Sequence, residues 1–341
     1  MTRRQFLATG SLLAAGTGAS MAASIKPKAL REGDTVGLIT PSTFVSDPEQ
    51  ILLAERTLRY FQLKPRFGRN VTKKEGYVGG SVEDRVADLH DMFRDPEVKA
   101  VFCIRGGFGA AHLLESIDYG LIASNPKILL GYSDITALHL AIHRKTGLVT
   151  FHGPVVLSRF TTYTQEHFRK AVFETRPLGT LQNPPDSDPL RPAHIVRTVR
   201  PGKARGPLVG GNLTLISTTL GTPYEIDTKG KILFIEDVDE QPYSVDRMLT
   251  HLKLAGKLDQ AAGIVFGECS DCRPRDFKPS FSSTFSTGEV VDRILGKLPI
   301  PVFSGLTIGH TGDQLTLPLG VMATLDAGEK KLIVEESATS A

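Results

Sequence analysis

The stretch Lys127-Ile-Leu-Leu-Gly-Tyr-Ser-Asp-Ile-Thr, residues 127–136, decides the fold class of this 341-residue chain. Its first half is a short apolar run typical of a buried strand, and a helical pattern starts directly after it, over 134–145. The same alternation occurs upstream, with strands and helices expected at 34–40, 47–60, from 81 onward and at 99–104. Strands that alternate with helices are typical of a parallel sheet covered on both faces. We therefore predict an α/β fold whose N-terminal domain, residues 25–165, is a three-layer α/β/α unit.

The second half of the chain has a different pattern. Residues 166–207 are expected to form a crossover linker, because most of this stretch is rich in Pro, Asp and Arg and lacks helical periodicity. Residues 208–336 are expected to form a smaller, β-rich α+β domain. Its predicted helix covers 245–255, and its predicted strands lie at 231–235, 263–267, 301–308, 314–317, 323–326 and 331–335.

The N-terminus predicts export. Thr2-Arg3-Arg4-Gln5-Phe6-Leu7 is a twin-arginine pattern, followed by a weakly apolar run to about residue 23 that ends in small residues. The run is too short and too rich in Gly and Ser to remain as a transmembrane helix. We therefore expect residues 1–22 to be a cleaved twin-arginine signal. The mature protein is then periplasmic, with no stable membrane insertion.

The composition excludes several classes of function. The formal charge of +3 falls to +1 when residues 1–22 are removed, since that segment holds Arg3 and Arg4 and no acid. No dense Lys/Arg cluster remains, so nucleic acid is not an expected partner.

The three cysteines predict no metal centre. Cys269 and Cys272 form a single C-x-x-C pair, and no second pair completes a zinc site. We interpret them as structural or incidental thiols, and a disulfide formed after export is the alternative. No metal and no cofactor is expected.

Ser133 is a candidate nucleophile. The order strand, Gly-x-Ser, helix is the setting of a nucleophile elbow, in which a sharp turn lifts the hydroxyl above the sheet. The second glycine of the usual Gly-x-Ser-x-Gly pattern is absent. A serine at a helix start is also a good N-cap, and this stretch alone leaves both roles open.

The glycine-rich turn Arg105-Gly-Gly-Phe-Gly-Ala also follows a predicted buried strand. Glycines let backbone N–H groups approach a ligand closely, which suits an oxyanion hole, a substrate turn or a phosphate cradle. A plain tight turn is the alternative. The dinucleotide fingerprint G-x-G-x-x-G is absent, which disfavours a nucleotide-dependent oxidoreductase.

Two further segments carry candidate acid–base groups. Glu236 and Asp237 end an apolar strand, and His310 lies between two glycines after another strand. His152 also lies at a strand end, so spacing leaves His310 and His152 equal as a general base. His139 and His143 have an i, i+4 metal-type spacing, but no H-E-x-x-H motif surrounds them, and we interpret both as ordinary helix residues.

Taken together, these motifs resemble the LD-carboxypeptidase family of serine peptidases, which includes muramoyltetrapeptide carboxypeptidases. The resemblance runs from about Ile25 to Glu335. It is carried by the order of several motifs, namely Gly-Asp-x-Val-Gly-Leu-Ile-x-Pro-Ser, Arg-Gly-Gly-Phe-Gly, Gly-Tyr-Ser-Asp-Ile-Thr-Ala-Leu, His-Gly-Pro, Gly-Gly-Asn-Leu, Phe-Ile-Glu-Asp-Val-Asp-Glu-Gln-Pro-Tyr-Ser-Val-Asp-Arg-Met-Leu and Ile-Gly-His-Thr.

The resemblance implies a catalytic triad assembled across the two domains. Ser133 is then the nucleophile, Glu236 the orienting acid and His310 the general base. The backbone N–H groups of Gly107 and Asp134 form the oxyanion hole. The implied reaction removes the terminal D-alanine from a peptidoglycan-derived tetrapeptide, and a homodimer is a possible assembly.

The substrate of such a reaction ends in a free carboxylate, for which a guanidinium is the natural partner. Arg105 is our candidate for this contact, and a structural salt bridge is its alternative role. Asn212 is a second candidate substrate contact.

Two features depart from the family. Phe108 stands where the family often has tyrosine, and family members that recycle cell wall act in the cytoplasm, whereas this chain carries an export signal. Two other functions stay open: hydrolysis of a peptidyl-nucleotide antibiotic, and binding of wall peptides without catalysis. The chain has no Trp to stack a base, which disfavours the antibiotic substrate.

Overall fold

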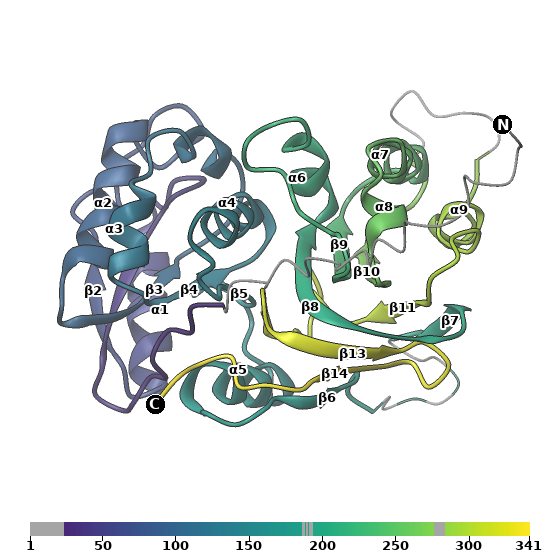
Figure 1. The fold of residues 1–341 in the computed structure, drawn as a ribbon. Helices are drawn as coiled ribbons and strands as arrows, with labels where there is room; N and C mark the ends of the chain where they lie inside the picture. The colour runs from purple at the N-terminus through teal and green to yellow at the C-terminus, as the bar shows by residue number, and fades with distance from the viewer. Residues whose placement is uncertain (1–23, 186–187, 189, 191–193, 276–283) are drawn as a thin grey trace, which may run out of the picture.

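The structure is a computed structural model that describes residues 24–185, 188, 190, 194–275 and 284–341. The predicted export signal, residues 1–22, lies outside the described residues. Two sheets organise the chain, one of six strands and one of eight (Figure 1).

The first sheet has the strand order β12-β5-β4-β3-β1-β2. Its strands pair in parallel except β12, which runs antiparallel to β5. The bounds are β1 Thr35–Ile39, β2 Lys64–Phe67, β3 Val98–Cys103, β4 Ile128–Gly131, β5 Phe151–His152 and β12 Leu317–Pro318.

Helices cover both faces of this sheet. Helices α2 (Val82–Arg94), α3 (Tyr119–Ser124) and α4 (Thr136–Thr146) share one apolar cluster with one face, and α1 (Pro48–Tyr60) and α5 (Thr162–Phe173) share another cluster with the opposite face. Their arrangement above and below the strands is visible in Figure 1. This confirms the predicted three-layer domain, because alternate residues of each buried strand pack against helices on opposite sides.

The second sheet has the strand order β6-β14-β13-β8-β9-β10-β11-β7. Its central four strands β8 (Lys203–Asn212), β9 (Ile232–Val238), β10 (Gly263–Ser270) and β11 (Val302–Leu306) are parallel, with antiparallel strands at both edges. The edge strands are β6 Gly179–Leu181, β7 Arg197–Arg200, β13 Met322–Asp326 and β14 Lys331–Val334. The helices of this half are α6 Leu213–Thr218, α7 Pro242–Leu254, α8 Lys257–Gln260 and α9 Thr287–Ile294.

Two segments differ from the sequence expectation. Residues 166–207 do cross from one sheet to the other, but they also contain most of α5, the edge strands β6 and β7 and the start of β8. Of the strand expected at 314–317, only Leu317 lies in β12, and β12 pairs with β5 of the first sheet rather than with its neighbours in sequence. The C-terminal half therefore completes the N-terminal sheet.

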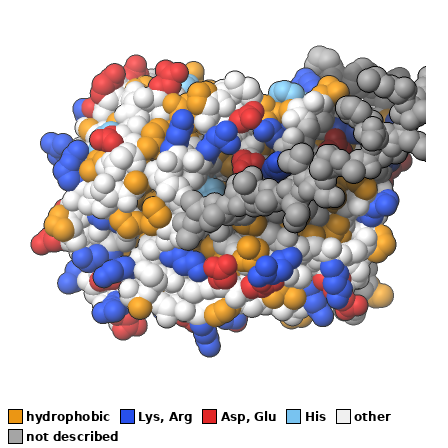
Figure 2. All heavy atoms as spheres, in the orientation of Figure 1, with side chains coloured by type: hydrophobic (Ala, Val, Ile, Leu, Met, Phe, Trp, Pro, Cys, Tyr) orange, Lys and Arg blue, Asp and Glu red, His pale blue; other side chains and the backbone are white. Residues whose placement is uncertain are grey.

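The surface carries charges of both signs. Outside the area covered by grey atoms, Figure 2 shows Lys and Arg interspersed with Asp and Glu, with no large area of one sign. Within the described part of the chain, no helix combines the length and apolar character needed to cross a bilayer.

Candidate active site

Ser133 follows the central strand β4 and lies in a sharp turn. Its φ of 64° is in the left-handed region, which a serine rarely occupies. A short 3-10 helix, Ser133–Ile135, leads directly into α4, and the N-terminal residues of both helices are capped by no side chain. Ser133 is therefore not an N-cap. Its strained backbone is the geometry of a nucleophile elbow.

Three side chains from the two halves of the chain form one hydrogen-bonded row. Ser133 Oγ lies 3.0 Å from His310 Nε2, and His310 Nδ1 lies 2.8 Å from Glu236 Oε2. Glu236 stands near the end of β9 and is fully buried, whereas the His310 side chain is 19% exposed. The row thus runs from a buried carboxylate to a hydroxyl at the end of the other sheet.

The loop after β11 brings His310 to Glu236 by a close backbone approach. A Cβ on Gly309 would lie only 2.1 Å from Glu236 Oε2, and Gly309 has a φ of +78°. The Gln314 side chain donates to Gly309 O at 2.6 Å, and Ser270 Oγ donates to the carbonyl oxygen of His310. Both residues therefore fix the main chain that carries the imidazole.

The glycine turn lies beside Ser133. A Cβ on Gly106 would be 3.5 Å from Ser133 Oγ, so the turn passes close to the hydroxyl. Gly107, with a φ of +117°, leaves no room for a Cβ because Thr43 Oγ1 would be 2.1 Å away. The Phe108 N–H donates to Thr43 Oγ1, whereas the Gly107 N–H makes no hydrogen bond to any described residue.

The Asp134 side chain ties this turn to the elbow. Its buried carboxylate accepts hydrogen bonds from Ser42 Oγ at 2.6 Å and from the Ala110 N–H at 2.7 Å. Burial raises the pKa of Asp134, and these two hydrogen bonds oppose that shift. From sequence, only the Asp134 main chain is expected to have a role, and Ser42 and Thr43 are not identified as part of the site. The Pro-Ser pair that ends the first strand was the available signal.

Arg105 and Asn212 have different surroundings. Arg105 is half-buried and makes no ion pair or hydrogen bond with the described residues, so the alternative role as a salt bridge finds no support there.

Asn212 is only 3% exposed. Its Nδ2 donates to Asp237 Oδ1 at 3.0 Å and its Oδ1 accepts from the Leu215 N–H. Asn212 is the N-cap of α6, and each polar group of its side chain makes one hydrogen bond inside the protein. An amide has a second N–H and a second lone pair, so a substrate contact by Asn212 stays a prediction.

His139 and His143 each contact a main-chain carbonyl oxygen. The His139 ring bonds to the Gly131 carbonyl through Nε2, and His143 Nδ1 lies 3.1 Å from the Leu148 carbonyl oxygen. No cluster of three or more His, Cys, Asp or Glu side chains suited to a metal occurs among the described residues. His152 is fully buried and lies beside Glu236, not beside Ser133.

The cysteine pair requires a correction. Cys269 and Cys272 form a disulfide at the end of β10, and Cys103 is free and buried. The expectation of structural or incidental thiols is therefore wrong, and the alternative, a disulfide, is correct.

Comparison with known proteins agrees with this site. Residues 36–153 match the LD-carboxypeptidase N-terminal domain, and residues 205–325 match the LD-carboxypeptidase C-terminal domain. The chain belongs to the LD-carboxypeptidase family. It is 42% identical to a probable murein peptide carboxypeptidase of Bacillus subtilis, over 91% of this chain and 94% of that protein. The murein tetrapeptide carboxypeptidase of Pseudomonas aeruginosa is 32% identical over 85% of this chain and 92% of its own length.

Solved structures of the family share the fold. The microcin C7 self-immunity protein MccF superimposes with a TM-score of 0.82 at 28% identity, covering 93% of this chain and 100% of that one. A muramoyltetrapeptide carboxypeptidase from Oxalobacter formigenes gives 0.75 at 28% identity, with 89% and 99% coverage. The family membership and the α/β fold predicted from sequence are confirmed, and the protein is a carboxypeptidase by family.

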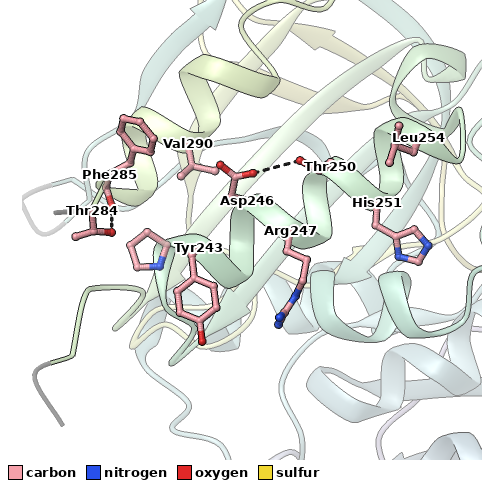
Figure 3. A pocket seen from close by; sticks show the side chains of 10 residues that line it. Tyr243, Asp246, Arg247, Thr250, His251, Leu254, Thr284, Phe285 and Val290 are labelled. Carbon is pink, nitrogen blue, oxygen red and sulfur yellow. Dashed lines mark hydrogen bonds between the residues drawn. The ribbon is translucent and has the colours of Figure 1, made fainter. Parts of the chain in front are cut away.

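A separate hollow of about 680 Å³ lies along α7 and α9 (Figure 3). Tyr243, Arg247, His251 and Phe285 are among the side chains around it. None of Ser133, Glu236 and His310 lines it, so this hollow is not the place of the family's chemistry.

Proposed function

We propose that the protein is a serine-type L,D-carboxypeptidase that releases the terminal D-alanine from murein tetrapeptides and leaves a tripeptide. The hydrogen-bonded row Ser133–His310–Glu236 carries this proposal, because it places a nucleophile, a base and an orienting acid in contact. Relatives with murein-peptide names support the substrate class.

Each of the three side chains has a defined task. His310 Nε2 takes the Ser133 proton as Oγ attacks the carbonyl carbon of the scissile bond, and then gives it to the leaving D-alanine nitrogen. Glu236 accepts the Nδ1–H hydrogen bond, which holds the imidazole in the tautomer with a free Nε2 and stabilises the imidazolium. In the second half-reaction, His310 deprotonates water, which attacks the acyl-enzyme, and Ser133 leaves with its proton restored.

The oxyanion of each tetrahedral intermediate needs donors close to Ser133. We assign the backbone N–H groups of Gly107 and Asp134 to this task. The Gly107 N–H has no partner among the described residues, and the glycine turn passes beside the Ser133 hydroxyl. Loss of one such donor typically costs roughly 3 kcal/mol of transition-state stabilisation.

Arg105 is the proposed anchor for the terminal carboxylate. It directly precedes the glycine turn and has no anionic partner among the described residues. A guanidinium can bind a carboxylate through two parallel hydrogen bonds, which fixes the D-alanine end relative to Ser133.

We also propose that the protein works in the periplasm after export through the twin-arginine route. Arg3 and Arg4 with the following apolar run support this location, and the Cys269–Cys272 disulfide is consistent with an oxidising compartment. The substrate is then a muropeptide met before uptake or a peptide of intact wall.

A second candidate is hydrolysis of an aminoacyl-nucleotide conjugate. The observation in its favour is the TM-score of 0.82 to MccF, which was solved with aspartyl sulfamoyl adenosine. The exposed rings of Phe108 and Tyr77 also lie next to the glycine turn, with centroids 5.4 Å apart. We favour the murein substrate because the chain contains no Trp, and because its match to a murein peptide carboxypeptidase reaches 42% identity against 29% for MccF.

One assay separates these functions. The protein without residues 1–22 is incubated with a disaccharide tetrapeptide or with aspartyl sulfamoyl adenosine, and products are followed by mass spectrometry, beside Ser133→Ala and an EDTA-treated sample. We expect D-alanine from the wild type with and without EDTA, and none from Ser133→Ala. Cleavage of the conjugate alone would select the second function, and D-alanine release by Ser133→Ala would refute the serine mechanism.

A further inference from the structure

His152 is a fully buried polar side chain that the mechanism above does not use. His152 is the last residue of β5 and pairs with Gly131 on the neighbouring strand β4. Gly131 lies two residues before Ser133. Neither ring nitrogen has a hydrogen-bond partner among the described residues. Since buried polar groups are almost always paired, two unpaired nitrogens on one buried ring require an explanation.

Glu236 has a buried acceptor atom that lacks a hydrogen bond. Its Oε2 accepts the hydrogen bond of His310, but its Oε1 is buried and has no partner in the described part of the chain. A buried carboxylate oxygen that accepts no hydrogen bond carries a large desolvation cost.

These two groups face each other. His152 Nε2 lies 4.0 Å from Glu236 Oε1. This distance is longer than a direct hydrogen bond. One water can bridge two polar groups that are too far apart for a direct bond, and a small closing movement makes the contact direct.

Other unpartnered polar atoms lie on the neighbouring elements. Thr150 Oγ1, two residues before His152, is buried without a partner among the described residues. His139 Nδ1 also has no partner there, and its ring centroid lies 6.4 Å from that of His152. Buried donors and acceptors of this kind can be satisfied by internal water.

We propose that His152 is a positioning residue for the catalytic acid: its Nε2–H donates to Glu236 Oε1, directly or through one bridging water. The hydrogen bond holds the carboxylate so that Oε2 stays aimed at His310 Nδ1. It also disperses the negative charge that Glu236 must keep when His310 is neutral. The inference rests on the proposed function, in which Glu236 orients the base.

The charges around the pair require His152 to act as a neutral donor. Burial first, and then the His139 and His310 rings, lower the pKa of His152 well below its usual value. The ring therefore holds one proton at neutral pH. A carboxylate facing Nε2 favours the tautomer with that proton on Nε2. Two further titratable side chains lie beside the pair: Tyr132, whose ring packs against His152, and Asp237, which follows Glu236 on β9.

The first test compares two substitutions in the enzyme without residues 1–22. His152→Phe fills the site without a donor, and His152→Gln restores an N–H near the Nε2 position. We expect His152→Phe to lower kcat on the tetrapeptide by about 10- to 100-fold with little change in KM. His152→Gln should recover most of this loss. His143→Phe, which removes another largely buried histidine on α4, is the matched control and should keep wild-type kcat.

The pH profile separates positioning from mere packing. Without the His152 donor, the state in which Glu236 is ionised and His310 is neutral loses stabilisation. The proton shared by Glu236 and His310 is therefore removed only at a higher pH. The acid limb of kcat/KM should therefore move to higher pH in His152→Phe, by about one unit. A merely structural role would lower the melting temperature or kcat and leave this limb in place. Wild-type kcat and an unmoved limb in His152→Phe would overturn the proposal, as would equal losses in the Phe and Gln variants.

A second measurement does not depend on the variants' folding or on the substrate. The ring-nitrogen NMR shifts of ¹⁵N-His-labelled wild-type enzyme report the tautomer of each histidine. We expect one ring, absent from the His152→Gln spectrum or assigned through bonds if that variant is unstable, to stay neutral with its proton on Nε2 from pH 5 to 8. A proton on Nδ1 overturns the proposal. If the wild type releases no D-alanine, the proposed function fails while this measurement still decides the hydrogen bond.

Discussion

Ser270 Oγ donates a hydrogen bond to the main-chain oxygen of His310, and Ser270 lies between the two cysteines of the Cys269–Cys272 disulfide. The disulfide thus closes the turn that contains Ser270, and the Ser270 side chain holds the main chain of the proposed base, His310. In the same turn, the Asp239 N–H donates to the Ser270 carbonyl, which connects it to the end of β9 beyond Glu236. A redox-sensitive bond therefore stands one hydrogen bond away from the triad.

Removal of this disulfide should weaken both stability and activity. In Cys269→Ser/Cys272→Ser we expect a loss of about 2 kcal/mol in the free energy of unfolding, the entropy associated with a loop of this size, and a severalfold lower kcat. Calorimetry and D-alanine release measure the two effects. Ser270→Ala, which keeps the disulfide, should lower kcat with little loss of stability. Unchanged kcat in both variants would show that the turn does not position His310.

Gly309 is the residue that lets the His310 loop touch Glu236. In Gly309→Ala the new methyl group would overlap Glu236 Oε2, and a φ of +78° adds backbone strain. The imidazole must then move away from the carboxylate, and displacements of about 1 Å at a catalytic group can cost 10²-fold in rate. We expect a loss of this order in kcat from single-turnover measurements.

Gly312 offers the matched control in the same loop. A Cβ there meets no atom within 4 Å, and its φ is outside the left-handed region. Gly312→Ala should therefore retain wild-type kcat. If both alanine variants lose activity equally, loop flexibility rather than the approach of Gly309 to Glu236 explains the effect.

The buried Asp134 should make stability depend on pH. Burial raises its pKa in the folded protein above the value in the unfolded chain, near 3.9. The folded protein therefore binds the Asp134 proton more tightly than the unfolded chain does. The contribution of this group to stability is full below about pH 3.9 and is lost as the pH rises through the folded pKa. Asp134→Asn keeps an oxygen for the Ala110 N–H and does not ionise. We expect the stability of the wild type relative to Asp134→Asn to fall from about pH 4 upward, measured by denaturant unfolding.

Contributions from other acids cancel in this comparison, because both proteins share them. An additional control is Asp91→Asn, on the surface of α2, where the difference from wild type should show no comparable fall. A difference between wild type and Asp134→Asn that stays constant from pH 4 to 8 would contradict the raised pKa.

The sequence predicted the elements that are buried on both faces better than those at the edges. Short apolar runs such as 128–131 and 232–235 are typical of strands that are buried on both faces, so the central parallel strands of the two sheets could be predicted. The edge strand Arg197-Thr-Val-Arg has no such run, because one side faces solvent, and it was included in a linker. The pairing of β12 with β5 joins residues more than 160 positions apart, and no local pattern encodes it.

The site shows the same limit. Ser133 at a strand-to-helix junction suits a cap or a nucleophile, and the choice depends on its φ and on which side chain meets its hydroxyl. His152 and His310 both follow strands with similar local sequence. Only the tertiary structure shows that His310 meets Ser133 and that His152 faces the back of Glu236. The family resemblance assigns the role of general base to His310 without the geometry, but it gives no reason why His152 is buried.

Arg105 should determine the preference for substrates with a free C-terminal carboxylate. With a tetrapeptide that ends in D-alanine, we expect Arg105→Ala to lower kcat/KM by about 10- to 100-fold, the range for one hydrogen bond to a charged group. With the same peptide ending in D-alaninamide, the wild type should already be slow, and the substitution should change little. Arg56→Ala, an exposed arginine on α1, is the control and should leave both rates as they are. Equal losses on the acid and the amide would assign Arg105 to the shape of the glycine turn instead of the carboxylate, because only a direct charge contact distinguishes the two substrates.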